Sequence, residues 1–302
     1  MNVKSLAGRV KRGDRVALAR AITMVEYDPS SAWALLRTAA PSGRAFVVGV
    51  TGAPGVGKST LVDRLVGAYR KEGLRVGVLA MDPTSPLTGG ALLGDRIRME
   101  GHAQDDGVYI RSMASRGWSG GLSRAASATV QLMDAAGFEL VILETVGIGQ
   151  ADVEVVSVAH AVVVVLSPGM GDEVQMSKAG LLEVGDVFAV NKADLEGANT
   201  VAIALLGAVR GRPNPPYVVS VSALSGEGVE KLKASLDSIR GRFLSGSHEL
   251  KEKSVRGLIL EMARGEALAR VDRAAAASAE RLARRVVAGE LTVAEAAARL
   301  SV

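Results

Sequence analysis

The sequence predicts an α/β fold with a mostly parallel, doubly wound sheet flanked by helices. From residue 46 onward, short aliphatic runs alternate with loops and helix-like segments, as in strands joined by crossover helices. These runs contain no charged residue, which is typical of strands buried on both faces of a parallel sheet. A glycine-rich phosphate-loop motif follows the first run. The three observations together predict a P-loop NTPase core.

The elements are expected in the following order along the chain. Residues 3–40 are expected to be helical, because apolar residues such as Val10, Leu18 and Ile22 recur at helical spacing. Pro41-Ser42-Gly43 ends this pattern, so we expect an N-terminal helical segment at residues 1–44. The expected strands are Phe46–Val50, Val76–Met81, Val108–Ile110, Leu140–Leu143, Ala161–Leu166, Val187–Val190 and Tyr217–Val221.

Beyond about Glu227 no further strand is expected. Residues 228–242 and 250–300 are helix-like, and the second segment is rich in Ala, Arg, Glu and Leu. A helix of that length cannot bury its apolar face alone, so it must pack on the core or on a second subunit. We therefore expect a nucleotide-binding domain at residues 45–245 and a C-terminal helical arm at 246–302.

The composition excludes several classes of protein. Hydrophobic residues make up 48% of the 302 residues, which excludes a disordered chain. Cysteine is absent, which excludes disulfides, thiolate metal sites and a cysteine nucleophile. The amino terminus lacks the apolar run of a signal peptide, and the most apolar stretch, Val153–Leu166, is too short to cross a bilayer. We expect a cytoplasmic protein without a membrane segment.

The net charge of +4 resides on the flanks, with +5 in residues 1–45 and +3 in residues 251–302. Basic flanks can bind nucleic acid, but no aromatic residues interleave with these charges, as a base-stacking surface would need. We interpret the charges as solvated faces of Arg/Ala-rich helices and do not expect nucleic acid as a partner.

The phosphate-loop motif fits G-x4-G-K-[ST] between a strand and a helix. Its glycines let successive backbone N–H groups turn toward one anion, and the following helix adds its positive end. Lys58 would bridge the β- and γ-phosphates, and the Ser59 hydroxyl would bind Mg²⁺. The candidate phosphate-binding residues are Gly52, Ala53, Pro54, Gly55, Val56, Gly57, Lys58, Ser59 and Thr60.

A second motif, Asn191-Lys192-Ala193-Asp194, follows a buried run and predicts a guanine reader. A carboxylate such as Asp194 can accept hydrogen bonds from both the ring N–H and the exocyclic amine of guanine, a donor pair that adenine lacks. Asn191 and Lys192 would hold the loop and cover the base. Ser222-Ala223-Leu224, after the last strand, resembles a second guanine loop, whose backbone N–H meets the guanine O6. The expected ligands are therefore GTP and GDP.

Acidic residues at strand ends are candidates for completing a magnesium site. Glu144 opens Glu144-Thr145-Val146-Gly147, where an acid can orient a metal-bound water and the Gly147 N–H can sense the γ-phosphate. Asp82 ends another strand, and Asp95 could enter from a glycine-rich loop. Each acid could instead be a solvated loop carboxylate, and the strand-end positions favour Asp82 and Glu144.

These residues together resemble the bacterial methylmalonyl-CoA mutase-associated GTPases, the MeaB or ArgK type, also called LAO/AO transport ATPases. This family belongs to the SIMIBI class of P-loop GTPases and is similar to the human methylmalonic aciduria type A protein. The resemblance covers residues 45–230. It rests on five motifs: Asp82-Pro83-Thr84-Ser85-Pro86, Gly94-Asp95-Arg96-Ile97-Arg98-Met99, Ile110-Arg111-Ser112-Met113, Glu144-Thr145-Val146-Gly147 and Gly171-Asp172-Glu173.

The resemblance implies a homodimeric GTPase whose C-terminal arm dimerises. It also implies a chaperone for an adenosylcobalamin-dependent acyl-CoA mutase, gating cofactor loading and protecting or reactivating the enzyme. Lys178 would lie in the family's third switch, where a partner repositions it to stimulate hydrolysis. The chain has Trp118-Ser119 where the family usually has a His-Leu-like pair, which leaves methylmalonyl-CoA mutase, isobutyryl-CoA mutase or another mutase open as the partner.

The expected reaction is in-line attack of water on the γ-phosphate, with Lys58, Mg²⁺ and loop N–H groups neutralising charge. No residue is an obvious general base or arginine finger. Arg96, Arg98, Arg111 and Arg116 lie in loop-like segments, where ordinary surface arginines are the favoured interpretation. We therefore expect slow intrinsic hydrolysis that a partner accelerates.

Two other functions remain as alternatives. A nickel or cobalt metallochaperone GTPase shares this fold class but should offer Cys/His ligands, whereas His102, His160 and His248 lie far apart in the sequence. An ATP-dependent kinase or transport ATPase, as in the older family name, would prefer ATP to GTP.

Overall fold

A computed structural model describes residues 2–27, 29–40, 42–82, 100–102, 104–114, 121–145, 158–169, 181–246 and 248–300. These residues form a seven-stranded sheet in which every neighbouring pair of strands is parallel. The strands are β1 (Phe46–Thr51), β2 (Val76–Asp82), β3 (Val108–Ala114), β4 (Leu140–Glu144), β5 (Ala161–Leu166), β6 (Val187–Val190) and β7 (Tyr217–Ser220). All seven predicted strands are confirmed, and β3 continues four residues beyond its expected end.

Helices and one 3₁₀ turn connect and cover the strands. They are α1 (Val3–Lys11), α2 (Arg15–Tyr27), α3 (Pro29–Ala39), α4 (Lys58–Lys71), η1 (Glu100–His102), α6 (Gly121–Ala135), α9 (Leu181–Val184), α10 (Ala198–Val209), α11 (Val229–Leu244), α12 (His248–Val287) and α13 (Val293–Ala298). The predicted N-terminal helical segment is three helices. The predicted C-terminal helix is two, because the chain turns at Gly289, which has a positive φ of 75°.

The strand order is β3-β2-β4-β1-β5-β6-β7, so β1 lies between β4 and β5. The strands β2, β3 and β4 lie on one side of β1, and β5, β6 and β7 lie on the other, which makes this the switch point of a doubly wound sheet. Ligands of such sheets bind at the carboxyl ends of the strands near this point. The predicted fold class is therefore confirmed.

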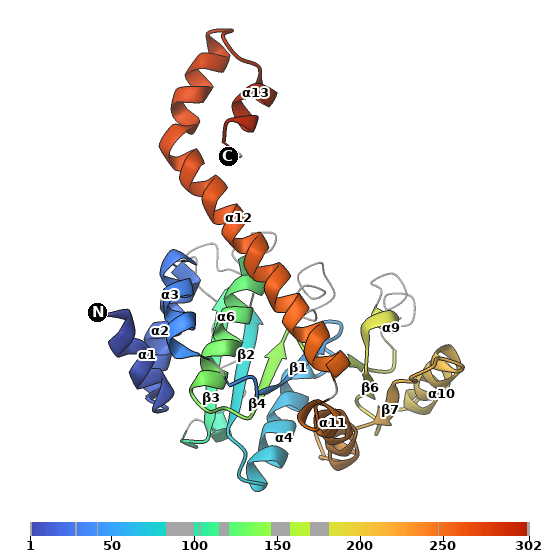
Figure 1. The fold of residues 1–302 in the computed structure, drawn as a ribbon. Coiled ribbons are helices and arrows are strands. Elements are labelled where there is room, and N and C mark those ends of the chain that lie inside the picture. The colour runs from blue at the N-terminus through green and yellow to red at the C-terminus, as the bar shows by residue number, and fades with distance from the viewer. Residues whose placement is uncertain are drawn as a thin grey trace.

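The core has two layers, one on each face of the sheet. Because successive strand residues face opposite sides, Phe46 and Val48 pack with α4 and α11, whereas Val47 packs with α1, α2, α3 and α6. The strands β1, β4, β5 and β6 are buried throughout, which explains their continuous aliphatic sequences. Figure 1 shows the helices on both sides of the sheet.

The helix α12 contains 40 residues and is about 60 Å long at 1.5 Å per residue. It contacts α3 and α6, then extends beyond the body of the molecule, where α13 folds back along it (Figure 1). A capping box begins α13, because the Thr292 side chain accepts from the Glu295 N–H and the Glu295 carboxylate accepts from the Thr292 N–H. Among the described residues, no helix combines the length and apolarity that a bilayer span requires.

Candidate nucleotide-binding site

Three of the predicted site segments meet at the carboxyl edge of the sheet. The segments 52–57, 191–194 and 222–224 follow β1, β6 and β7, whose carboxyl ends all lie at this edge. Hydrogen bonds of the middle segment join them, from Asn191 to Val56 and from Ala223 to Asn191, and the Ala193 N–H donates to the Val221 carbonyl at 3.0 Å. Residues far apart in the sequence therefore form one continuous surface.

Two glycines of the segment 52–57, Gly52 and Gly57, are required by their surroundings. Gly52 has φ +146°, and a Cβ there would lie 2.2 Å from the Val165 carbonyl oxygen of β5. Gly57 has φ +93°, and a Cβ there would lie 2.4 Å from Asn191 Nδ2. Backbone and a buried amide cannot give way by that much, so a side chain at either position would push the loop away from the sheet.

Gly57 also caps the amino terminus of α4 without a side-chain hydrogen bond. The first N–H groups of a helix need partners outside the helix, and an anion placed there gains from both these donors and the helix dipole. The strand–loop–helix context that the phosphate-loop motif requires is confirmed.

The Lys58 side chain is buried against its own loop. Its Nζ donates to the Gly52 carbonyl at 2.9 Å and to the Ala53 carbonyl at 3.0 Å, and only 7% of the residue is exposed. The ammonium is thus held at the loop that would surround a phosphate. A bound phosphate would offer it a charged acceptor in addition to neutral carbonyls.

Ser59 and Glu144 meet at the centre of this edge. The Ser59 hydroxyl donates to Glu144 Oε1 at 2.6 Å, and both residues are buried. The sheet produces this contact, because β4 pairs with β1 and places Glu144 opposite Val50. Hydroxyl and carboxylate oxygens are ligands that Mg²⁺ prefers, so this pair fits a magnesium ion.

Of the other predicted magnesium and switch residues, the structure describes only the backbone of Asp82. The backbone of Asp82 ends β2, beside Ala114 of β3, whereas its side chain is not described. Asp95, Gly147 and Lys178 lie outside the described residues, as do Arg96, Arg98, Arg116 and Trp118.

Asn191 links the two base-side loops to the phosphate loop. Its Nδ2 donates to the Val56 carbonyl at 2.7 Å, and its Oδ1 accepts from the Ala223 N–H at 3.0 Å. The residue is 2% exposed, so water competes little for these bonds. Lys192, with a positive φ of 57°, donates from Nζ to the Gly55 carbonyl at 3.0 Å. The expectation that Asn191 and Lys192 hold the loop agrees with these contacts.

Asp194 lies exposed at the end of the same loop. A hydrogen bond from the Ser222 side chain lowers the pKa of its carboxyl group, and a hydrogen bond from its own backbone N–H lowers it further. The carboxylate therefore stays ionised at neutral pH, as an acceptor of two guanine N–H donors must be. The Ser222 side chain thus joins the two predicted guanine loops, in addition to the backbone bond between Ala193 and Val221.

Sequence reasoning missed Arg64, on α4. Its Nε donates to the Ala223 carbonyl at 2.9 Å, and its Nη2 donates to the Leu224 carbonyl at 2.6 Å. No motif marks Arg64, because its partners lie about 160 residues further along the chain and meet it only after folding.

Arg111, in contrast, has a structural contact. Its Nη2 lies 2.5 Å from Glu26 Oε2 and 3.2 Å from the Thr23 hydroxyl, and this pair joins β3 to α2. The sequence favours interpreting Arg111 as an ordinary surface arginine. The structure gives it a structural role instead, since its side chain is mostly covered and pairs with Glu26.

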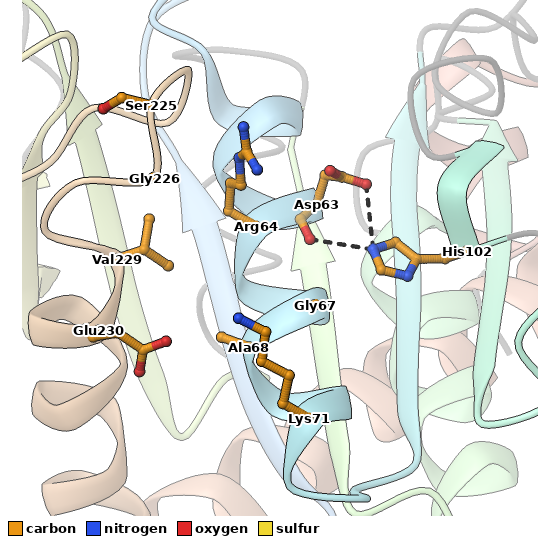
Figure 2. Close-up of a pocket in the computed structure, with 10 residues that line it drawn as sticks. All are labelled: Asp63, Arg64, Gly67, Ala68, Lys71, His102, Ser225, Gly226, Val229 and Glu230. Carbon is orange, nitrogen blue, oxygen red and sulfur yellow. Dashed lines mark hydrogen bonds and ion pairs between the residues drawn. The ribbon is translucent and has the colours of Figure 1, made fainter.

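A separate pocket of about 410 Å³ lies along α4 (Figure 2). It is bounded on one side by Ser225 and Gly226, behind the second guanine loop, and on the other by His102. The His102 Nε2 is 3.3 Å from the Asp63 carbonyl and 3.4 Å from Asp63 Oδ1. In the described part of the chain, no three His, Asp or Glu side chains are grouped as a metal site would require.

Comparison with known proteins relates this site to one family. The family model described as "Methylmalonyl Co-A mutase-associated GTPase MeaB" matches residues 18–276 of this chain. A protein of Pyrococcus abyssi named as a GTPase is 48% identical over 260 residues, covering 83% of this chain and 80% of that protein. GTPase ArgK of Escherichia coli is 38% identical over 237 residues, covering 74% of this chain and 72% of ArgK.

Two further matches extend the comparison. The mitochondrial methylmalonic aciduria type A homolog of Mus musculus is 32% identical over 266 residues, covering 80% of this chain and 64% of the mouse protein. A crystal structure of a protein named as an LAO/AO transport system kinase superposes with a TM-score of 0.71 at 25% identity, covering 100% of this chain and 98% of that one. The region matched by the family model includes the phosphate loop and both guanine loops.

Proposed function

This chain belongs to the MeaB family of methylmalonyl-CoA mutase-associated GTPases and is a P-loop GTPase, and from that premise we propose that it is a chaperone of an adenosylcobalamin-dependent acyl-CoA mutase. In this role it gates loading of the mutase cofactor and protects or reactivates the enzyme. The match of the mutase-associated family model over residues 18–276 carries the proposal.

In the proposed site, different loops at the carboxyl edge bind the phosphates and the base of GTP. Lys58 and the N–H groups of residues 52–60 bind the phosphates, where the amino terminus of α4, which no side chain caps, favours negative charge. Asp194 binds the base from one side and the loop 222–224 from the other. The 2.7 Å and 3.0 Å bonds of Asn191 support this arrangement, since they fix the distance between the phosphate loop and the base loops.

A magnesium ion would be held by Ser59 and Glu144, with Asp82 and Asp95 as further candidate ligands. When bound, Mg²⁺ neutralises charge on the phosphate oxygens. The Ser59 hydroxyl donates its proton to Glu144 at 2.6 Å, and a hydroxyl oxygen that donates its proton still carries lone pairs that can bind a metal ion. Asp95, Gly147 and Lys178 are proposed to complete the site as switch residues, with Lys178 contributing to catalysis when the mutase binds.

The arm at residues 246–302 is proposed to form a homodimer. On α12, Ile259 and Leu260 are 61% and 48% exposed, adjacent apolar side chains on a helix that extends away from the core (Figure 1). Covering such side chains with a second copy removes apolar surface from water, at about 25 cal/mol per Å².

The central test compares nucleotide turnover with and without a mutase. The purified full-length protein is assayed for phosphate release from GTP and from ATP, alone, with methylmalonyl-CoA mutase, with isobutyryl-CoA mutase and with serum albumin as the control. We expect slow turnover of GTP alone and at least tenfold faster turnover with one of the two mutases. Equal turnover in all four mixtures would overturn the chaperone proposal.

The ATP measurement addresses the second candidate. The solved structure of 25% identity is that of a protein named as a transport system kinase, and preferential turnover of ATP would favour that function for this chain. A tight one-to-one nickel or cobalt complex in calorimetry would instead favour a metallochaperone.

A further inference from the structure

The guanidinium of Arg64 joins α4, the helix after the phosphate loop, to the loop that follows β7. It donates to two successive backbone carbonyls, those of Ala223 at 2.9 Å and Leu224 at 2.6 Å. Figure 2 shows Arg64 on α4 extending toward the end of the pocket where Ser225 lies. One side chain thus contacts both peptide groups that flank Leu224.

The buried Ala223 anchors the loop in the core, and hydrogen bonds hold the loop at the exposed Leu224. Leu224 is 80% exposed, so packing of its side chain does not hold the loop. The turn is closed by the Gly226 N–H, which donates to the Ser222 carbonyl at 2.8 Å. The Ala223 N–H is directed to Asn191 Oδ1 at 3.0 Å. Arg64 supplies the contacts on the opposite side, to the carbonyls.

Because the peptide group is planar, the contacts of Arg64 with the carbonyls also set the direction of the neighbouring N–H groups. In a trans peptide the C=O and N–H bonds lie in one plane and point in opposite directions. The Ala223 carbonyl belongs to the same peptide group as the Leu224 N–H. Because Arg64 draws that carbonyl toward α4, the Leu224 N–H is directed away from α4.

We propose that Arg64 is a positioning residue for guanine recognition, which orients the Leu224 N–H to donate to O6 of the base. This inference rests on the proposed assignment of residues 191–194 and 222–224 to guanine. Since the Ala223 N–H already donates to Asn191, the Leu224 N–H is the next donor along the loop. Arg64 itself touches neither the base nor the phosphates.

The pocket in Figure 2 offers a matched control residue. Lys71 lies on the same helix two turns after Arg64, lines the same pocket and is also exposed. Its side chain makes no hydrogen bond or ion pair with any residue that the structure describes. Lys71→Ala therefore removes a similar positive charge without touching the guanine loop.

The experiment measures the affinities of four nucleotides for the full-length chain by calorimetry. GDP is the reference, and 6-thio-GDP replaces only O6 with sulfur, a weaker acceptor. IDP lacks only the 2-amino group that Asp194 would accept from, and ADP tests the choice of base as a whole. The variants are Arg64→Ala, Arg64→Lys and Lys71→Ala.

We expect Arg64→Ala to reduce the preference for GDP over 6-thio-GDP about fivefold, the value of one neutral hydrogen bond. The preference for GDP over IDP should be unchanged, since Asp194 is untouched, and GDP should dissociate faster. Arg64→Lys should restore part of the lost preference, because an ammonium can bond one of the two carbonyls. Lys71→Ala should behave as wild type.

Two different results would overturn the inference: one concerns Arg64 alone, and the other also concerns the proposed guanine loops. If Arg64→Ala weakens GDP, 6-thio-GDP and IDP by the same factor, Arg64 acts only on the stability of the loop. If the wild-type chain binds GDP, IDP and ADP equally, the assignment of the guanine loops fails, and the role of Arg64 fails with it. Thermal unfolding of each variant with and without GDP separates a folding defect from a change in recognition.

Discussion

The carboxyl edge of the sheet and the C-terminal arm differ in how many contacts their side chains make within the chain. At the edge, Asn191 and Arg64 connect loops from three strands through backbone groups, and Asn191 is almost completely buried. On the arm, Ile259 and Leu260 expose about half or more of their area. The loops at the edge are therefore connected to one another within one chain, whereas we propose that a second copy covers the exposed apolar side chains of the arm. Changes at the edge should affect the isolated chain, and changes on the arm should affect assembly.

The largest effect is expected for Lys58→Ala, which removes the ammonium at the phosphate loop. Because that ammonium would neutralise charge on the transferring phosphate, we expect GTP turnover to fall at least about 100-fold. Phosphate release measures the change, and circular dichroism checks the fold. Lys71→Ala, on the same helix, should keep full turnover; a similar loss in both variants would contradict the role of Lys58.

The second prediction concerns Asp134, at the end of α6, whose buried carboxylate holds the segment that leads into β1. It accepts from the N–H groups of Gly43, Arg44 and Ala45 at 2.7, 3.0 and 2.8 Å, and from the Ser42 hydroxyl at 2.8 Å. Asp134→Asn keeps the shape but replaces a carboxylate with a neutral amide. We expect the free energy of unfolding to fall by about 2–3 kcal/mol, because bonds to a charged acceptor are the stronger ones.

Urea unfolding monitored by circular dichroism measures this loss. Asp106→Asn is the matched control, since Asp106 is exposed on the surface and should change stability by less than about 0.5 kcal/mol. Equal stability of Asp134→Asn and wild type would show that the carboxylate is not needed to hold this segment.

The third prediction is a pH dependence that His160 confers on the core. Burial lowers the pKa of His160 to about 4, with the nearby Asp134 charge opposing the shift. Its Nδ1 accepts from the Val47 N–H at 2.8 Å, and its ring packs against Phe46 and Phe243. The folded state thus holds a neutral imidazole.

In the unfolded chain the imidazole has a pKa of about 6.5. The unfolded state therefore binds a proton first as the pH falls, so stability is full above about pH 6.5 and is lost between 6.5 and 4. From pH 7 to pH 5 we expect the free energy of unfolding to fall by about 2 kcal/mol through this group. His160→Asn, whose Oδ1 can still accept from Val47, should be less sensitive to pH over this range; an identical pH dependence would contradict the prediction.

The smallest effect on the core is expected for Ile259→Asp, on the exposed part of α12. It should leave the basal GTP turnover of the isolated chain unchanged and shift stability by less than about 0.5 kcal/mol. A charge in an apolar contact between two copies should instead convert a dimer to monomers. Analytical ultracentrifugation measures the change, with Glu280→Lys as a control on the charged surface of the same helix. A dimer that survives Ile259→Asp would place the interface elsewhere.

Much of the fold could be predicted from the sequence because its strands are buried on both faces. A strand such as Ala161–Leu166, with every residue buried, has to be aliphatic throughout, and that run is visible without a structure. Helix ends were harder to predict. The break between α12 and α13 depends on a turn at Gly289 and on the capping box of Thr292 and Glu295, two short signals within a long sequence rich in Ala and Glu.

In the candidate site, too, some residues could be predicted from the sequence and others could not. Lys58, Ser59, Asn191 and Asp194 could be predicted as site residues because phosphate and guanine each demand fixed chemical groups at short spacing along the chain. By itself, the sequence therefore determined the nucleotide and the class of fold. Only the tertiary structure decided which groups hold those motifs in place: Glu144 on Ser59, and Arg64 on the carbonyls of Ala223 and Leu224. These contacts use backbone atoms or pairs distant in sequence, and backbone carbonyls are the same in every residue, so no local pattern records them.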